Sequence, residues 1–189
     1  MMSGTSIVTN TRNHNVKRIW VIIGLLSAVM VAIFITTSTS AVPSLVTFTD
    51  GGQSLGNWTS HSVALGDVDG DGDLDAFIAN VSQGNKVWIN DGSGTFADNG
   101  QSLGSGISRG VALGDMDGDG DLDAFITNKG QGNKVWTNNG SGIFTDSGQS
   151  LGSGSSNSVA LGDLDGDGDL DAFVANYGEG NKVWTNDGS

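Results

Sequence analysis

The sequence predicts an all-β protein built from three copies of a 48-residue unit, and three observations support this fold class. An aspartate-rich segment occurs three times at a fixed spacing of 48 residues. The chain of 189 residues contains 31 glycines and a single proline, a composition typical of a chain rich in turns. Each unit contains four short segments with the composition of β-strands, separated by glycine-containing turns. A fixed internal period of this length indicates a repeat architecture.

The four predicted strands of a unit follow one another closely along the chain. In the first unit they cover residues 62–66, 74–80, 85–90 and a segment that begins near Thr95 and ends before Gly100. The dipeptide Asp91-Gly92 supplies a turn of the hairpin type between the third and fourth strands. Four strands in each 48-residue repeat are typical of a blade of a β-propeller. A β-solenoid is the competing architecture, but its coils are usually shorter.

The repeat region starts and stops inside a unit, not at a unit boundary. Residues 61–108 and 109–156 are full copies, whereas the third copy, 157–189, stops before its fourth strand. The missing stretch has a counterpart in residues 46–60, which align with residues 94–108, so residues 46–60 plus 157–189 make up one unit. We therefore expect Thr47–Gly52 to supply the outer strand that the last blade lacks.

Three blades are fewer than the four to eight of typical propellers. The sequence therefore predicts either a partial ring or a ring that is completed by association of chains. A homodimer of two three-bladed halves would give six blades. A fragment of a longer protein is the alternative.

The amino-terminal region predicts export. Residues 19–36 form an apolar run of 18 residues, and Arg12, Lys17 and Arg18 precede it without any acidic residue. The run fits either a transmembrane signal anchor or the hydrophobic part of a signal peptide. We expect a cytoplasmic basic segment (1–18), this hydrophobic helix, a linker (37–45) and the repeats (46–189) on the extracellular side, membrane-anchored or secreted.

The aspartate-rich segments predict metal sites. Each reads D-x-D-x-D-G-x-x-D with a fifth acid between, and three such loops hold fifteen of the chain's 21 acidic residues. Carboxylate and carbonyl oxygens are the ligands that Ca²⁺ prefers, and a loop of these ligands without His or Cys argues against zinc or copper. The sequence predicts one Ca²⁺ for each loop, three in all. The predicted ligand residues are Asp67, Asp69, Asp71, Asp73 through its carbonyl, Asp75, Asp115, Asp117, Asp119, Asp121, Asp123, Asp163, Asp165, Asp167, Asp169 and Asp171.

Composition argues against several other functions. The net charge of −13 excludes nucleic acid as an expected partner, because phosphate binding requires clustered Lys and Arg. His61 is the only histidine after the apolar run, and Arg109 and Asn157 occupy its position in the other repeats. No nucleophile motif accompanies His61. The sequence therefore predicts a protein that is not an enzyme.

Repeated aromatic residues allow two interpretations. A tryptophan recurs in the sequence Asn-Lys-Val-Trp of every unit, at Trp88, Trp136 and Trp184. Such rings can form sugar-binding platforms between blades. Packing between neighbouring sheets, together with Phe77, Phe125 and Phe173, is the interpretation that we favour.

The segment Ala-Leu-Gly-Asp-Val-Asp-Gly-Asp-Gly-Asp-Leu-Asp-Ala-Phe, residues 64–77, resembles the FG-GAP or VCBS-type repeat of bacterial surface proteins and of integrin α-subunit propellers. The resemblance covers residues 46–189. It implies a propeller that binds Ca²⁺ in the hairpin loops between the first two strands of each blade. It also implies a non-catalytic scaffold for cell adhesion or for interaction with a protein or glycan ligand. A carbohydrate-binding propeller and an accessory domain of a longer extracellular enzyme are the alternatives.

Overall fold

The computed structural model describes residues 46–188 of the chain. The basic segment, the apolar run 19–36 and the linker of the sequence analysis therefore lie outside the described residues. The chain divides into two units, Met1–Thr49 and Asp50–Ser189, and the second unit contains all the strands described below. No stretch of residues 46–188 forms a helix that is long and apolar enough to cross a membrane.

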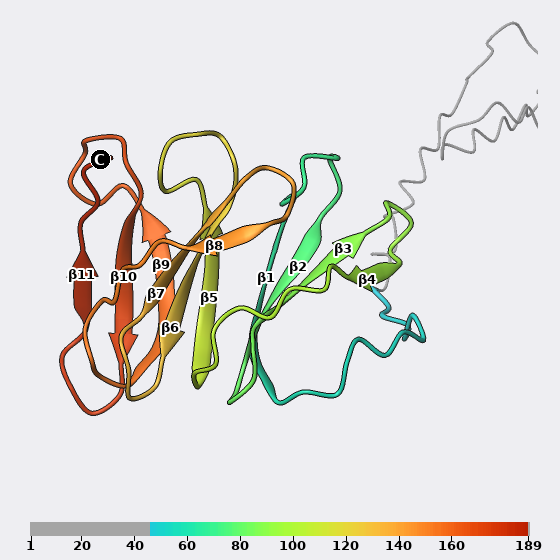
Figure 1. The fold of residues 1–189 in the computed structure, drawn as a ribbon, viewed down its shortest axis with the longest axis horizontal. Helices are drawn as coiled ribbons and strands as arrows, with labels where there is room; N and C mark the ends of the chain where they lie inside the picture. The colour runs from blue at the N-terminus through green and yellow to red at the C-terminus, as the bar shows by residue number, and fades with distance from the viewer. Residues whose placement is uncertain (1–45, 189) are drawn as a thin grey trace, which may run out of the picture. The chain divides into compact units, whose positions relative to one another are not determined.

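The second unit is all-β and contains three antiparallel sheets (Figure 1). Each sheet is a meander, in which strands that follow one another in the sequence are hydrogen-bonded neighbours. The first sheet contains β1 (Ser60–Gly66), β2 (Asp75–Asn80), β3 (Lys86–Asn90) and β4 (Phe96–Asp98). The second contains β5 (Ser108–Gly114), β6 (Asp123–Asn128), β7 (Lys134–Asn138) and β8 (Phe144–Asp146). The third contains β9 (Ser156–Gly162), β10 (Asp171–Asn176) and β11 (Lys182–Trp184).

The predicted all-β class and the division of each unit into short strands are confirmed, with small shifts at the strand ends. The first strand begins at Ser60, two residues earlier than expected, because Ser60 pairs with Asn80 across a β-bulge. The fourth strand is only three residues long. The register repeats from sheet to sheet, since Phe77 pairs with Val87 just as Phe125 pairs with Val135.

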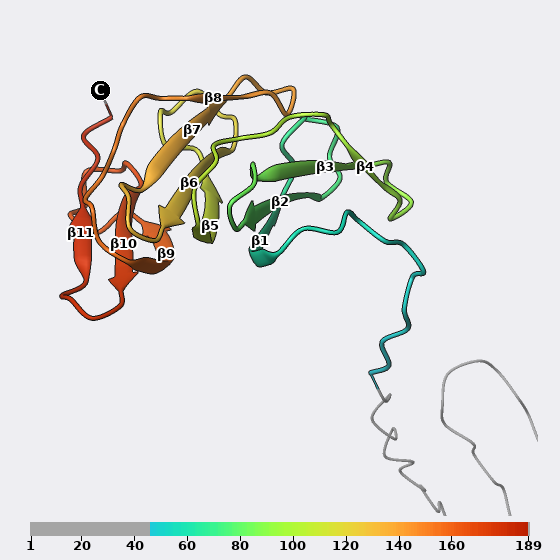
Figure 2. The same ribbon diagram turned by 60° about the horizontal axis from the view of Figure 1, so that its bottom comes forward.

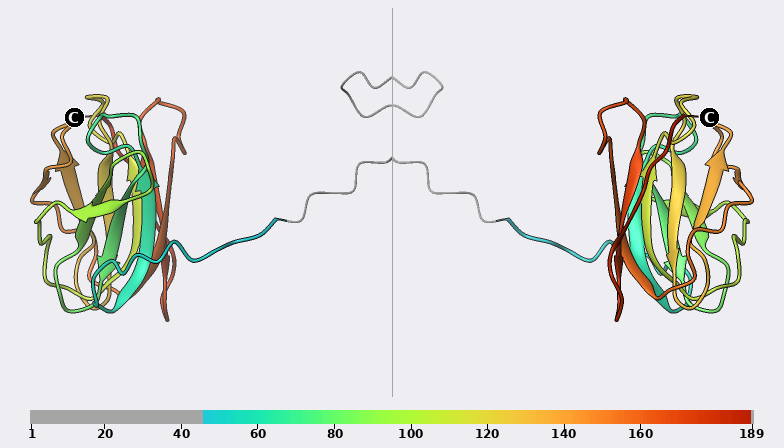
Figure 3. Two further views of the ribbon diagram at one scale, coloured as in Figure 1. Left: turned by 90° about the vertical axis from the view of Figure 1, so that its right-hand side faces the viewer. Right: turned by 90° about the vertical axis from the view of Figure 1, so that its left-hand side faces the viewer.

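The hydrophobic core lies between the sheets, which follow one another along an arc (Figures 2 and 3). Between the first and second sheets, the rings of Phe77 and Phe144 pack in a T-shaped arrangement, with ring centroids 5.1 Å apart and an interplanar angle of 85°. Around this pair, buried aliphatic residues of both sheets form one cluster. β8, the fourth strand of the second sheet, therefore also belongs to the interface with the first sheet.

The arc has two uncovered ends within the second unit. Phe173 and Val183 of the third sheet are exposed, although their counterparts in the first two sheets are buried. On the first sheet, Val63 and Leu65 of β1 are exposed as well. The third sheet has three strands, and residues 46–59 contain no strand, so the structure shows no closed ring.

Candidate metal centre

Each aspartate-rich loop joins the first strand of a sheet to the second, at the same end of all three sheets. The strand pairing brings the two loop ends together, because Gly66 at the end of β1 lies opposite Asp75 at the start of β2. The loop reverses direction through two glycines in the left-handed region, Gly70 at φ 80° and Gly72 at φ 95°. A residue with a Cβ atom rarely adopts these angles.

The first aspartate of each loop folds the loop around its own carboxylate. Asp67 Oδ1 accepts a hydrogen bond of 2.8 Å from the Gly70 N–H, and Asp67 Oδ2 accepts one of 2.9 Å from the Gly72 N–H. Asp115 and Asp163 accept the corresponding pairs of bonds in the second and third loops. The loop conformation is therefore defined by the protein itself and places the following carboxylates on a fixed backbone.

The aspartate at position nine of each loop is buried and accepts two backbone hydrogen bonds. Asp75 is fully buried, and its two oxygens accept backbone hydrogen bonds from Val68 at 3.0 Å and from Asn90 at 2.8 Å. Asp123 and Asp171 are equally buried and accept the equivalent bonds. Because Asn90 belongs to β3, this carboxylate joins the loop to the third strand of its sheet. Each carboxylate oxygen retains a lone pair that could bind a cation.

Carboxylates converge in all three loops. In each, one oxygen from each of three carboxylates lies within 4.8 Å of the others. The three groups are Asp67, Asp69 and Asp71; Asp115, Asp117 and Asp123; and Asp163, Asp165 and Asp171. Both salt bridges found among residues 46–188 lie elsewhere, Lys86 with Asp98 and Lys134 with Asp146. The loops thus gather hard oxygen ligands without a neutralising side chain, a donor set that fits Ca²⁺.

The crowding of like charges also affects proton binding. Loss of hydration raises the pKa of the Asp69 carboxyl above its ordinary value, and the negative charge of Asp75 adds to this effect. In the third loop, loss of hydration and the charge of Asp167 raise the pKa of Asp165 in the same direction. A raised pKa means that the folded loop disfavours the ionised form, which a divalent cation would stabilise.

The aspartate at position seven of each loop lies apart from the group of converging carboxylates. The Asp73 carboxylate lies against Gly92 in the β3–β4 turn, in the space that a Cβ atom at Gly92 would occupy. Asp121 and Asp169 lie in the same way against Gly140 and Gly188. With the side chain placed there, the role of the Asp73 backbone carbonyl as a calcium ligand stays a prediction from the sequence.

Sequence reasoning missed the contact between each loop and the next sheet. The Val68 carbonyl accepts a hydrogen bond of 2.8 Å from Asn138 Nδ2 and another of 2.8 Å from the Gly142 N–H. One repeat later, the Met116 carbonyl accepts a bond of 2.7 Å from Asn186 Nδ2. The first and second candidate metal loops therefore lie at the junctions between sheets. The recurrence of this asparagine every 48 residues was the signal that could have revealed its role.

The tryptophans and the histidine singled out in the sequence differ in their burial. Trp136 and Trp184 are partly buried and pack against the apolar clusters between sheets, and Trp88 is buried. These positions favour packing over a sugar-binding platform. His61 lies exposed on β1, and its counterpart Arg109 donates a hydrogen bond of 3.4 Å to Asn157.

The three antiparallel sheets of repeated units, each with an acidic loop, are consistent with the blades of a propeller-like repeat domain. A model of the FG-GAP-like repeat matches residues 67–126 and 115–174, more than half of the chain. The chain therefore belongs to the FG-GAP-like repeat family, as the resemblance predicted. A search of curated proteins found no match.

Proposed function

We propose that this chain is an exported, calcium-stabilised β-propeller repeat protein that serves as a non-catalytic scaffold for adhesion or protein interaction. The observation that carries the proposal is the threefold convergence of carboxylates in loops that contain no basic side chain. Export rests on the amino-terminal sequence alone, with its basic flank and apolar run. Adhesion rests on membership of the family, which is a weaker basis, because one fold serves many functions.

In each loop the first, third and fifth aspartates would hold the cation with the carbonyl of the seventh, and the buried ninth would complete the site. A bound Ca²⁺ would neutralise the converging carboxylates and fix the loop. Because the backbone of the same loop accepts hydrogen bonds from the next sheet, a fixed loop would also fix the junction between sheets. The metal is thus proposed to be structural.

Removal of calcium is expected to lower the stability of the protein. Extracellular calcium modules bind with Kd of about 10⁻⁴–10⁻³ M. At tenfold excess over Kd, each ion would add about 1.4 kcal/mol to the free energy of unfolding. Three ions would contribute about 4 kcal/mol, which corresponds to a fall in Tm of about 10 °C for a domain of this size. Thermal unfolding in millimolar Ca²⁺ and in EDTA measures the difference.

Two controls make this experiment specific. Calorimetric titration of the full chain should give three Ca²⁺ per chain, and Mg²⁺ at the same concentration should not restore the Tm lost in EDTA. The Asp69→Asn variant should lose one ion, whereas Asp98→Asn, an acid outside the loops that pairs with Lys86, should retain all three. An identical Tm with and without EDTA would contradict the calcium proposal.

The exported scaffold requires separate tests. Protease added to intact cells should cleave the repeats if they lie on the extracellular side, while a cytoplasmic marker stays intact. Cells that display the chain should then adhere to a surface in Ca²⁺ and detach in EDTA. Adhesion unaffected by loss of the chain would contradict the scaffold role and would leave the calcium proposal to its own test.

A further inference from the structure

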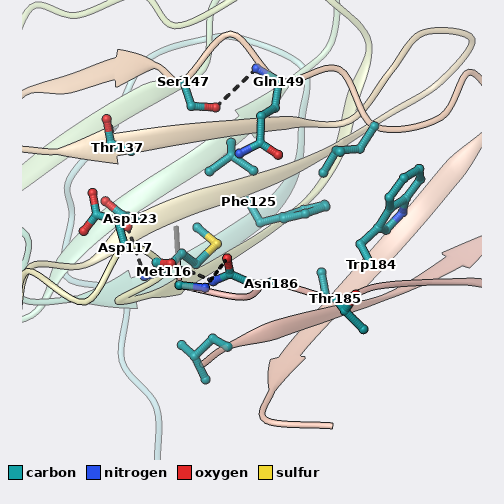
Figure 4. A pocket seen from close by; sticks show the side chains of 15 residues that line it. Met116, Asp117, Asp123, Phe125, Thr137, Ser147, Gln149, Trp184, Thr185 and Asn186 are labelled. Atoms are coloured by element: carbon teal, nitrogen blue, oxygen red, sulfur yellow. Dashed lines mark hydrogen bonds between the residues drawn. The ribbon is translucent and has the colours of Figure 1, made fainter. Parts of the chain in front are cut away.

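Two pockets lie between the second and third sheets. The first, of about 200 Å³, reaches the acidic loop of the second sheet, and Figure 4 shows Asp117 and Asp123 in its wall. The second, of about 330 Å³, lies between the opposite ends of the same two sheets. We call this second pocket the basic pocket. Its lining residues are Arg109, Lys129, Ser155, Asn157 and Tyr177.

The basic pocket lies at the end of the sheets that faces away from the acidic loops. Arg109 and Asn157 stand at the starts of β5 and β9, whereas the acidic loops follow the ends of these strands. Lys129 directly follows the end of β6. The second sheet has a neighbour on either side, because β5 contacts both β1 and β9. Among residues 46–188, none of β11 and none before Arg109 lines the pocket.

The two basic residues of this pocket are not part of the 48-residue repeat. The position of Arg109 holds a histidine in the first repeat and an asparagine in the third. The position of Lys129 holds a valine in the first repeat and a tyrosine in the third. By contrast, Lys86, Lys134 and Lys182 occupy one and the same repeat position. The fold of a repeat therefore does not require a cation at the position of Arg109 or of Lys129.

A glycine beside Arg109 brings the two walls of the pocket together. Gly110 replaces a serine that both other repeats have at this position. A Cβ atom there would lie 2.7 Å from Thr127 Oγ1 and 3.0 Å from the Asn157 carbonyl oxygen, so only glycine allows this close approach. Thr127, which pairs with Gly110, likewise replaces an alanine of both other repeats. The second repeat thus departs from its neighbours at four positions at the same end of β5 and β6.

Neither cation of the basic pocket has an acidic partner. Both salt bridges among residues 46–188 involve other lysines. Arg109 Nη1 donates a long hydrogen bond of 3.4 Å to Asn157 Oδ1, and the buried Arg109 Nε has no partner within the described part of the chain. Buried polar atoms are rarely left in this state, because a lost hydrogen bond is costly there. One acid lies beside the pocket, Glu179, and it accepts the Ser155 N–H at 3.1 Å.

We propose that the basic pocket binds an oxyanion, the carboxylate, sulfate or phosphate group of a ligand. The guanidinium of Arg109 would donate two parallel hydrogen bonds to such a group, and Lys129 would add a second positive charge. The Ser155 hydroxyl and the Asn157 amide are neutral donors in the same wall. The volume falls within the range of small-ligand sites, about 300–1,000 Å³. The proposal goes beyond the scaffold function and depends on neither calcium nor export.

The position of the pocket reduces the repulsion of anions by the rest of the chain, whose net charge is −13. A strand rises about 3.3 Å per residue, so β5 places about 20 Å between Arg109 and Asp115, the first carboxylate of the acidic loop. Charges separated by more than about 8 Å are largely screened at physiological ionic strength. An anion in the pocket would therefore interact mainly with Arg109, Lys129 and Glu179, and its affinity should fall as salt is added.

The arginines of the chain provide a direct probe of this site. The chain contains three, Arg12, Arg18 and Arg109, and Arg109→Asn identifies the Arg109 Nε–H signal in a ¹⁵N spectrum. Sodium acetate, sulfate or phosphate is added to the full chain in a mild neutral detergent, without calcium and at an ionic strength held constant with sodium chloride. At least one of the three anions is expected to shift the Arg109 signal in a saturable way and to leave the other two arginine signals unchanged. The anion with the highest affinity shows which group the ligand carries.

Two variants taken from the other repeats test the two cations. Arg109→Asn introduces the residue of the third repeat and Lys129→Val that of the first, so both should fold with unchanged circular dichroism. Each is expected to weaken binding of the preferred anion at least tenfold, since one charge-assisted hydrogen bond is lost. The backbone amide signals of Gly110 and Asn157 follow binding in all variants. Lys182→Gln removes the same charge outside the pocket and should leave the affinity unchanged.

Three results would overturn the proposal. The first is the absence of a saturable shift with all three anions. The second is an equal shift when chloride alone is increased, which would show screening of an exposed charge only. The third is an affinity that both Arg109→Asn and Lys129→Val leave unchanged. None of these results would affect the calcium or export proposals, which have their own tests.

Discussion

Replacement of Phe144 by alanine is expected to lower the free energy of unfolding by about 3–5 kcal/mol, as large-to-small substitutions of buried aromatic residues do. Phe144 is only 5% exposed and contacts Phe77, which is fully buried. The substitution would leave a cavity between the first two sheets, at the point where β8 meets the previous repeat. It would also remove the aromatic pair, which contributes beyond its buried area.

Urea-induced unfolding, followed by circular dichroism, measures the effect of Phe144→Ala. Tyr177→Ala is a matched control, because this aromatic side chain is exposed and its loss should change the stability by less than about 0.5 kcal/mol. All variants should be compared at the same concentrations of protein and of Ca²⁺, because both self-association and Ca²⁺ binding would shift the apparent stability. A loss below about 1 kcal/mol for Phe144→Ala would contradict the view that β8 fixes the junction between sheets.

Asp123→Ala is expected to destabilise the second sheet even without metal. The buried Asp123 carboxylate accepts the N–H groups of Met116 and Asn138, at 3.0 and 2.8 Å. Alanine would leave the buried Asn138 donor and the partly buried Met116 donor without an acceptor. A buried donor without a partner costs about 1–3 kcal/mol, and a partly buried one costs less. We therefore expect a loss of about 2–5 kcal/mol from the two donors in EDTA, and a larger loss in Ca²⁺.

The contrast with Asp119→Asn separates the structural role of a loop aspartate from its metal role. Asp119 is exposed, and a single backbone hydrogen bond to its side chain, from Asp121, is seen in the described part of the chain. Its substitution should lower the stability in Ca²⁺ and change it little in EDTA. Unfolding curves for both variants in both buffers test the distinction. If Asp123→Ala lowered the stability only in Ca²⁺, the buried carboxylate would act as a metal ligand, and its two backbone hydrogen bonds would contribute nothing to stability.

Local features of this fold could be predicted from the sequence, whereas contacts between repeats could not. Alternating residues such as Val87 and Ile89 define strands, and the Asp-Gly pattern of the loops defines the reversals, because both depend on neighbours in the chain. Which loop aspartate accepts structural hydrogen bonds, and which is exposed, depends instead on burial in the folded chain. Asp71 and Asp75 look equivalent in sequence, but only Asp75 is buried and bonded both to its own loop and to β3.

The contacts between sheets depend on atoms far apart in the chain. Asn138 reaches the Val68 carbonyl across 70 residues, and Gln101 reaches Gly142 across 41. Neither residue belongs to a motif with a known local geometry. Their recurrence every 48 residues marks them as part of the repeat, but their partners could be identified only after the sheets had been placed side by side.

These inter-sheet contacts also bear on how such a chain can evolve. The separation of 70 residues occurs again between Asn186 and Met116, and the separation of 41 occurs again between Gln53 and Gly94. Each repeat therefore contacts the next one through the same kind of surface through which the previous repeat contacts it. Duplication or deletion of a whole 48-residue unit in the gene would recreate these junctions unchanged, whereas an insertion of another length within a strand or an acidic loop would displace the partners. Natural variation in length among such proteins should therefore proceed in whole repeats.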